Sequence, residues 1–157
     1  MSTMQIDVPA RLRRAGTRFG YAVAVVLNLA MLIVVQNILD WGWLPFLTDE
    51  FADVVPWISF SLIVAIVLNL VYQFNDATPV KSTGQIVSNL ISIFVTYQVL
   101  TVFPFDFSES SFDWALVTRI VMVLAMVGAG IGALTEVMKL AGGEAEKRKE
   151  VTGDNGI

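Results

Sequence analysis

Residues 19–39 read FGYAVAVVLNLAMLIVVQNIL and contain no Asp, Glu, Lys or Arg. An α-helix needs about 20 apolar residues to cross the roughly 30 Å hydrocarbon layer of a bilayer. A signal peptide has a shorter apolar region of about 7–15 residues that ends at small residues. Residues 36–44, QNILDWGWL, offer no such cleavage site. The stretch therefore predicts a membrane-spanning anchor.

Three more charge-free stretches follow, and the last belongs to a longer helical pattern that ends near Leu140. A water-soluble bundle would need a wide polar face on each helix, and none of these stretches has one. We therefore predict an all-α integral membrane four-helix bundle with up-down-up-down topology. The expected helices lie at about 19–39, 54–74, 84–103 and 112–140.

The composition excludes several kinds of chemistry. Of the 157 residues, 55% are hydrophobic and 15% charged, against about 25% charged in soluble domains. There is no cysteine and no histidine, which removes disulfides, the usual zinc sites and His-ligated haem. No nucleophile motif and no pair of intramembrane carboxylates is present. We expect no catalytic residue, no metal, no cofactor and no enzymatic activity.

The basic residues predict the orientation, because cytoplasmic loops of membrane proteins are rich in Lys and Arg. Nine of the ten lie on one predicted side: Arg11, Arg13, Arg14, Arg18, Lys81, Lys139, Lys147, Arg148 and Lys149. The loops of the other side, 40–53 and 104–113, carry seven acidic residues and no basic one. We expect a multi-pass protein of the plasma (inner) membrane with both termini in the cytoplasm.

Two polar segments flank the expected bundle. Residues 1–18 form a basic cytoplasmic arm, and residues 141–157, AGGEAEKRKEVTGDNGI, form a polar tail of mixed charge that we expect to be disordered.

Aromatic residues gather on the predicted outer side. All four tryptophans lie there: Trp41, Trp43, Trp57 and Trp114. Trp favours the headgroup level of a bilayer, so we expect the outer loops to pack together as an aromatic cap. Thr48 can cap a helix with acids in its first turn, which predicts a short interfacial helix over about 49–55, ending before Pro56. The cap is either an ordinary aromatic belt or a docking surface for a partner or lipid.

Polar side chains share faces on the first three expected helices, at about 100° per residue. The candidates are Asn28, Gln36, Asn69, Gln73, Asn89, Ser92 and Thr96. Polar groups in the bilayer core seek partners, so these faces should point at each other. They either join the helices by hydrogen bonds or form a polar pathway for a small solute or ion.

Residues 126–137, MVGAGIGALTEV, carry three glycines within a membrane helix. A phosphate-binding loop needs a preceding strand, so we reject nucleotide binding. Small residues on one helix face allow close packing of helices in lipid. Ala125, Gly128, Ala129 and Gly132 share such a face, which meets either a helix of the same chain or a neighbouring chain.

Two charges near the ends of the fourth helix need partners. Arg119 is the basic residue of its outer half, and we expect it to pair with Asp40 as an outer clamp. Glu136 lies three residues from Lys139, which predicts a solvated ion pair.

The sequence leaves two classes of function open. The first is a non-enzymatic accessory, assembly or scaffold component of a membrane complex. The second is a transporter or channel that uses the polar faces of the first three helices. The size and four helices are similar to those of small multidrug resistance proteins, which use a glutamate of the first helix, but here that helix has Asn28 and no carboxylate. Expected partners are the lipid bilayer, other membrane proteins or a second copy, and no nucleic acid.

Overall fold

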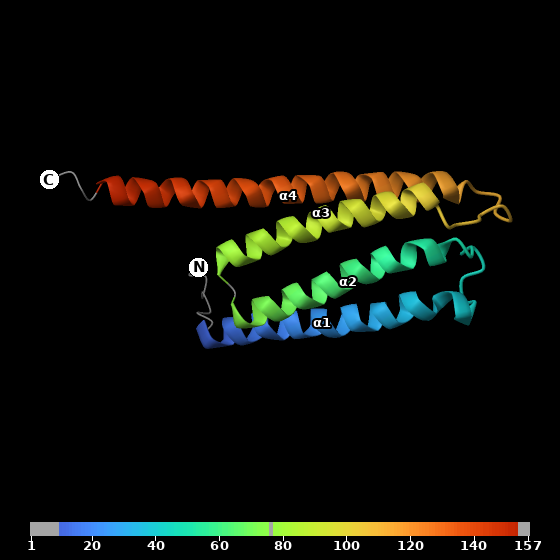
Figure 1. The fold of residues 1–157 in the computed structure, drawn as a ribbon, viewed down its shortest axis with the longest axis horizontal. Coiled ribbons are helices and arrows are strands. Elements are labelled where there is room, and N and C mark those ends of the chain that lie inside the picture. Colours follow the sequence, from blue (N-terminus) through green and yellow to red (C-terminus); the bar gives the residue numbers. More distant parts are fainter. Residues whose placement is uncertain (1–9, 76, 154–157) are drawn as a thin grey trace, which may run out of the picture.

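The computed structural model describes residues 10–75 and 77–153, with side chains described from residue 16 to residue 143. The chain folds into four helices (Figure 1), and no sheet is present in these parts of the chain. They are α1 (Ala10–Trp41), α2 (Phe51–Phe74), α3 (Thr78–Val102) and α4 (Trp114–Gly153).

The helices lie in a row in the order of the sequence, with α1 at one edge and α4 at the other (Figure 1). Each packs against its neighbours in the row, α1 on α2, α2 on α3 and α3 on α4. Along their described parts, the backbones of α1 and α4 do not contact each other. The row is therefore open, and over the described residues the backbone of each edge helix packs against a single neighbour.

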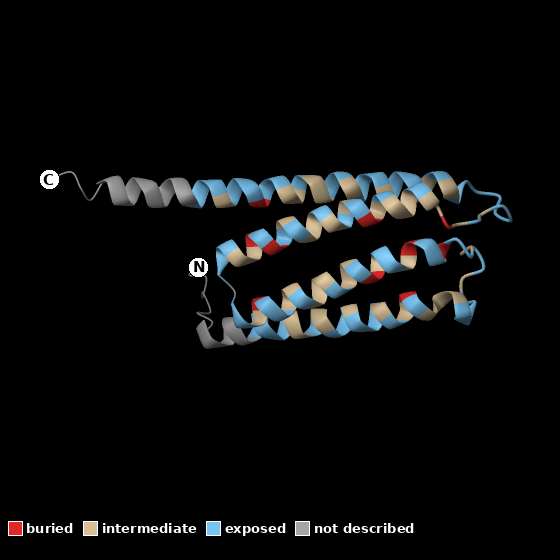
Figure 2. Ribbon diagram, in the orientation of Figure 1, coloured by how far each residue is buried: buried red, intermediate tan, exposed pale blue. Residues whose placement is uncertain are grey.

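Each of the four helices contains a segment that is long and apolar enough to cross a membrane. Most of their surface is exposed or only partly covered (Figure 2). Large apolar side chains remain outside, such as Phe74 at 88% exposure and Leu124 at 64%. Contact of such side chains with hydrocarbon is favourable, whereas their exposure to water costs free energy. The prediction of an all-helical chain with four candidate membrane spans is confirmed.

The main apolar cluster lies where α1 and α2 approach the loop between them. Val35, Phe51 and Val54 are buried there, and Val54 is fully buried. Val99 and Val102 of α3 pack against the same cluster. This cluster joins three of the four helices at the end of the row that carries the loops 42–50 and 103–113, which we call the outer end after the orientation predicted from the sequence. The opposite end is called the inner end.

The first outer loop leads directly into α2, and a separate interfacial helix over 49–55 is not present. The helix begins at Phe51 and continues through Pro56 to Phe74. Proline removes the hydrogen bond to the carbonyl of Ala52. The buried side chains of Phe51 and Val54, both of which precede the proline, hold the first turn of α2 in place.

Two helices extend beyond their apolar stretches. α4 continues to Gly153, although we expected disorder from residue 141, because Ala, Glu, Lys and Arg in this segment are strong helix formers. α1 begins at Ala10, within the expected basic arm. Residues 1–9 and 154–157 of the expected arm and tail lie outside the described residues.

The ends of α3 and α4 carry residues that are typical of helix termini. Asp113 caps α4, because its Oδ1 accepts from the backbone N–H of Leu116 at 2.9 Å. Pro79 stands in the first turn of α3, where its missing N–H costs nothing. α3 ends at Val102, and the next residue, Phe103, caps it in a left-handed conformation with φ of 47°.

Candidate functional site

The polar side chains expected inside the membrane meet in part at a cavity between α1, α2 and α3. This cavity has a volume of about 220 Å³. Its polar lining comes from three helices: Asn28, Ser61, Ser88, Ser92 and Thr96. The structure therefore brings polar groups of the first three helices together at one place, including three of the residues singled out in the sequence.

The asparagine amides of α1 and α2 bond to their own helices. Nδ2 of Asn28 donates to the carbonyl of Ala24, and Nδ2 of Asn69 donates to the carbonyl of Ala65, both at 2.7 Å. These donors do not join neighbouring helices. Asn28 also lines the cavity.

The remaining amides have three different surroundings. Nε2 of Gln73 donates to the backbone carbonyl of Arg18 at 3.2 Å and so joins α2 to α1. Gln36 is exposed on α1. Asn89 of α3 lies against Gly132 of α4. Only Gln73 of this set makes the expected hydrogen bond between helices, to a backbone atom of its neighbour.

The small residues of α4 divide between two directions. A Cβ at Gly132 would lie 2.9 Å from Nδ2 of Asn89, whereas a Cβ at Gly128 would meet nothing within 4 Å. Ala129 and Gly132 are partly covered, and Ala125 and Gly128 are exposed. Gly132 of the predicted face therefore packs against α3, whereas Ala125 and Gly128 remain uncovered.

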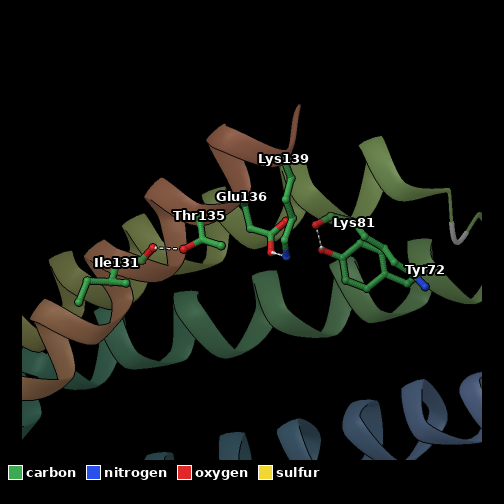
Figure 3. A network of polar contacts seen from close by, with 6 residues as sticks. All are labelled: Tyr72, Lys81, Ile131, Thr135, Glu136 and Lys139. Atoms are coloured by element: carbon green, nitrogen blue, oxygen red, sulfur yellow. Dashed lines mark hydrogen bonds and ion pairs between the residues drawn. The ribbon is translucent and has the colours of Figure 1, made fainter. Parts of the chain in front are cut away.

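A second cluster lies at the inner end of the row, beside the turn between α2 and α3, and is called the inner cluster below. The hydroxyl of Tyr72 donates to the carbonyl of Lys81 at 3.4 Å (Figure 3). A Cβ at Gly84 would overlap this hydroxyl and lie 2.8 Å from Cζ of the same ring. The rings of Tyr72 and Tyr21 are 5.6 Å apart, and Nζ of Lys81 lies 5.4 Å from the Tyr21 ring. These contacts tie α1, α2 and α3 together.

α4 adds a buried carboxylate at this same end. Oε1 of Glu136 is 2.5 Å from Nζ of Lys139, which is the expected pair at spacing i,i+3 (Figure 3). Glu136 is only 7% exposed, so its carboxylate is not solvated as expected. The buried hydroxyl of Ser82 on α3 also bonds to it. The hydrogen bond between Ser82 and Glu136 therefore joins α3 to α4, whereas the ion pair with Lys139 lies within α4.

Three residues of this inner cluster were missed in the sequence: Tyr72, Ser82 and Gly84. Tyr72 and Gly84 flank the short turn between α2 and α3. A large aromatic residue before such a turn and a glycine after it is a sequence pattern that could have predicted their contact. Ser82 carries no comparable signal, because an isolated serine is common in any helix.

The two outer loops are joined by their backbones. The N–H of Thr48 donates to the carbonyl of Pro104 at 3.1 Å, and the N–H of Asp106 donates to the carbonyl of Phe46 at 2.8 Å. Leu47 and Phe105 form an isolated antiparallel bridge between them. Hydrogen bonds of this kind fix one loop against the other irrespective of the side chains.

Phenylalanines rather than tryptophans form the contact between these loops. The rings of Phe46, Phe105 and Phe107 lie 5.5–6.5 Å from one another. The four tryptophans have other partners. Trp41 pairs with Trp43, Trp57 meets Phe94, and Trp114 meets Phe112.

Arg119 has a partner other than the expected Asp40. Its guanidinium lies 4.3 Å from the centroid of the Phe103 ring, in a cation–π contact. Asp40 ends α1 at one edge of the row, whereas Arg119 belongs to α4 at the other. Since these helices do not contact each other, no ion pair joins the two side chains.

Within the described parts of the chain, no three His, Cys, Asp or Glu side chains stand close enough to hold a metal ion. Comparisons of the chain with protein families, with curated proteins and with solved structures found no match.

Proposed function

We propose that this protein is a non-enzymatic accessory, assembly or scaffold component of a membrane complex. Its expected partners are lipid and other membrane proteins or a second copy. The chain has no cysteine and no histidine, which leaves few residues suited to catalysis or metal binding.

The observation that carries this proposal is the open row. Over the described residues, the backbone of α1 packs on α2 alone and that of α4 packs on α3 alone. An edge helix of this kind has a free face along its length, where a helix of another protein can pack. Association in lipid depends on close packing at small residues, and α4 leaves Ala125 and Gly128 uncovered.

In this proposal the four helices cross the plasma membrane up-down-up-down, with both termini in the cytoplasm. The distribution of Lys and Arg supports that orientation. A reporter enzyme that works only in the cytoplasm should be active when it is fused after Gly156. A reporter that works only outside the cell should be inactive at the same position, and its activity there would contradict the proposed orientation.

The function is tested by crosslinking in intact membranes, followed by purification in a mild detergent. We expect a partner, or a second copy, in constant ratio to the protein. Replacing both Ala125 and Gly128 with Leu should abolish that association by filling the small face. The matched control is Val127→Leu, which changes an exposed apolar side chain on the same helix.

A chain that stays alone in crosslinked membranes would contradict the accessory role. Association that survives the substitutions at Ala125 and Gly128, or that is lost equally with Val127→Leu, would show that the partner does not pack on this small face.

The cavity of about 220 Å³ between α1, α2 and α3 favours a second candidate function, transport of a small polar solute or ion. Flux into liposomes that contain the purified protein tests it. A flux that falls when Ser92 and Thr96 are replaced with Ala and Val would favour transport over the accessory role.

A further inference from the structure

A larger cavity of about 730 Å³ lies between the two outer loops and the start of α4. Binding sites for small molecules range from about 300 to 1,000 Å³. Its walls include the aromatic rings of Phe46, Phe105, Phe107 and Trp114. Asp106 and Glu109 also line it, and both are exposed.

The aromatic walls are held in place before any ligand arrives. Phe46 belongs to one loop, and Phe105 and Phe107 belong to the other. Phe107 stacks on both of the other rings, with interplanar angles of 25° and 14°. The backbone hydrogen bond from Asp106 to Phe46 joins the two loops at the same place. A site with fixed walls loses less entropy on binding than one that must order its loops.

The side-chain charges of the two loops beside this cavity have a single sign. The loops over residues 40–53 and 104–113 carry seven carboxylates and no Lys or Arg. One oxygen of Asp106 accepts from the backbone N–H of Ser108 at 2.9 Å, which positions the carboxylate. This hydrogen bond also lowers the pKa of Asp106, so the group is ionised at neutral pH. Such a field attracts cations.

Two positive charges lie near this end of the chain, and each has a partner. The N-terminus of α4 carries a partial positive charge, but Asp113 caps it by accepting from Leu116. Arg119 lies over the ring of Phe103, and this ring is not part of the cavity wall. Neither charge occupies the aromatic cavity.

We propose that this cavity binds a quaternary ammonium group, with Phe46, Phe105, Phe107 and Trp114 facing its methyl groups and Asp106 and Glu109 neutralising its charge. The faces of aromatic rings attract cations, and a bulky methylated cation loses little hydration when it enters an apolar cavity. The site is independent of the accessory role proposed above. The group can belong to a soluble compound such as choline or to a phosphocholine lipid.

The direct test is calorimetric titration of the full-length protein, purified in a maltoside detergent that carries no ammonium group. The probes are choline and its neutral isostere 3,3-dimethyl-1-butanol, which has the same shape without the charge. We expect choline to bind at least about tenfold more tightly, from several cation–π contacts and the nearby carboxylates. Equal binding of the two probes, or binding of neither probe or lipid, would overturn the proposal.

Variants separate the rings from the carboxylates. Phe107→Leu keeps an apolar wall without a ring and should weaken choline binding roughly three- to tenfold. Asp106→Asn should weaken it roughly two- to fivefold, and less at high salt. Asp49→Asn removes the same charge outside the cavity lining and is the matched control. An equal loss with Asp49→Asn and Asp106→Asn would show that the general field, not this cavity, attracts the cation.

Nanodiscs distinguish the two sources of the ammonium group. If a lipid supplies it, phosphatidylcholine should stabilise the wild-type protein more than phosphatidylglycerol does, and Phe107→Leu should remove that difference. If a soluble compound supplies it, choline binds in the detergent titration and the two lipids stabilise equally.

Discussion

The two ends of the helical row are held together in different ways. At the outer end, two loops are joined by backbone hydrogen bonds and three phenylalanine rings. At the inner end, the chain between α2 and α3 is short, and side chains of the helices themselves meet. The contact of Tyr72 with Gly84 leaves no space for a Cβ. The comparison shows that the inner end depends on individual side chains, whereas the outer end depends more on the path of the backbone.

The largest effect is expected for Gly84→Ala at the inner end. The added Cβ would overlap the Tyr72 hydroxyl, and overpacking of this kind costs about 1–3 kcal/mol. The matched control is Gly128→Ala, where the Cβ meets nothing within 4 Å. That control should leave stability unchanged or raise it by up to about 1 kcal/mol, since Gly is a poor helix former. Thermal unfolding in detergent measures both.

A double mutant makes the same comparison sharper. Tyr72→Phe removes the overlapping oxygen, so the cost of Gly84→Ala should be smaller in that background. Additive effects of the two substitutions would contradict the packing of Tyr72 on Gly84, because residues in contact couple.

The next effect concerns the contact between α3 and α4, the two helices at one side of the row. Gly132→Leu should destabilise the fold by about 1–3 kcal/mol, because the side chain would displace Asn89. Gly128→Leu should leave the stability of the single chain nearly unchanged. If both substitutions have the same effect on thermal stability, the division of this small face between two directions is wrong.

A smaller effect is expected at the outer end from Arg119. Arg119→Gln removes the cation that lies over Phe103, and an exposed cation–π contact contributes about 0.5–1 kcal/mol. Phe103→Leu should cost a similar amount, and the double mutant should cost less than the sum. Asp40→Asn is the control, since its effect on stability should add to that of Arg119→Gln. A coupling energy between these two substitutions would instead support the ion pair predicted from the sequence.

The smallest effect is expected from titration of Asp106. The N–H of Ser108 lowers the pKa of this carboxyl below its ordinary value of 3.8. The stabilisation that ionised Asp106 gives the folded state is therefore complete above the ordinary pKa. It is lost as the pH falls through the lowered pKa of the folded state. Asp106→Asn should remove this pH dependence and leave stability near pH 7 almost unchanged. Thermal unfolding between pH 2 and pH 5, roughly the range of carboxyl titration, measures it.

The helices could be predicted from the sequence because the absence of charge over about 20 residues is a strong signal for a membrane span. The ends of the helices could not. α2 passes through Pro56, since the loss of one hydrogen bond is smaller than the gain from burying Val54. α4 continues past residue 141, because polarity does not end a helix of good helix formers.

Contacts between helices were harder to predict, because one sequence does not give the rotation of a helix against its neighbours. Of the small residues predicted on one face of α4, Gly132 lies against Asn89 of α3, whereas Ala125 and Gly128 are exposed. Asp40 was a reasonable partner for Arg119 only if α1 and α4 were neighbours. The aromatic cap was predicted from composition, but which rings meet depends on the loop backbone.

The central claim is that lipid surrounds this open row of four helices, and membrane extraction tests it most directly. The account predicts that the full-length protein stays with the membrane in alkaline carbonate and leaves it only with detergent. A chain that is released by carbonate, and then stays monodisperse in buffer without any amphiphile, would contradict it.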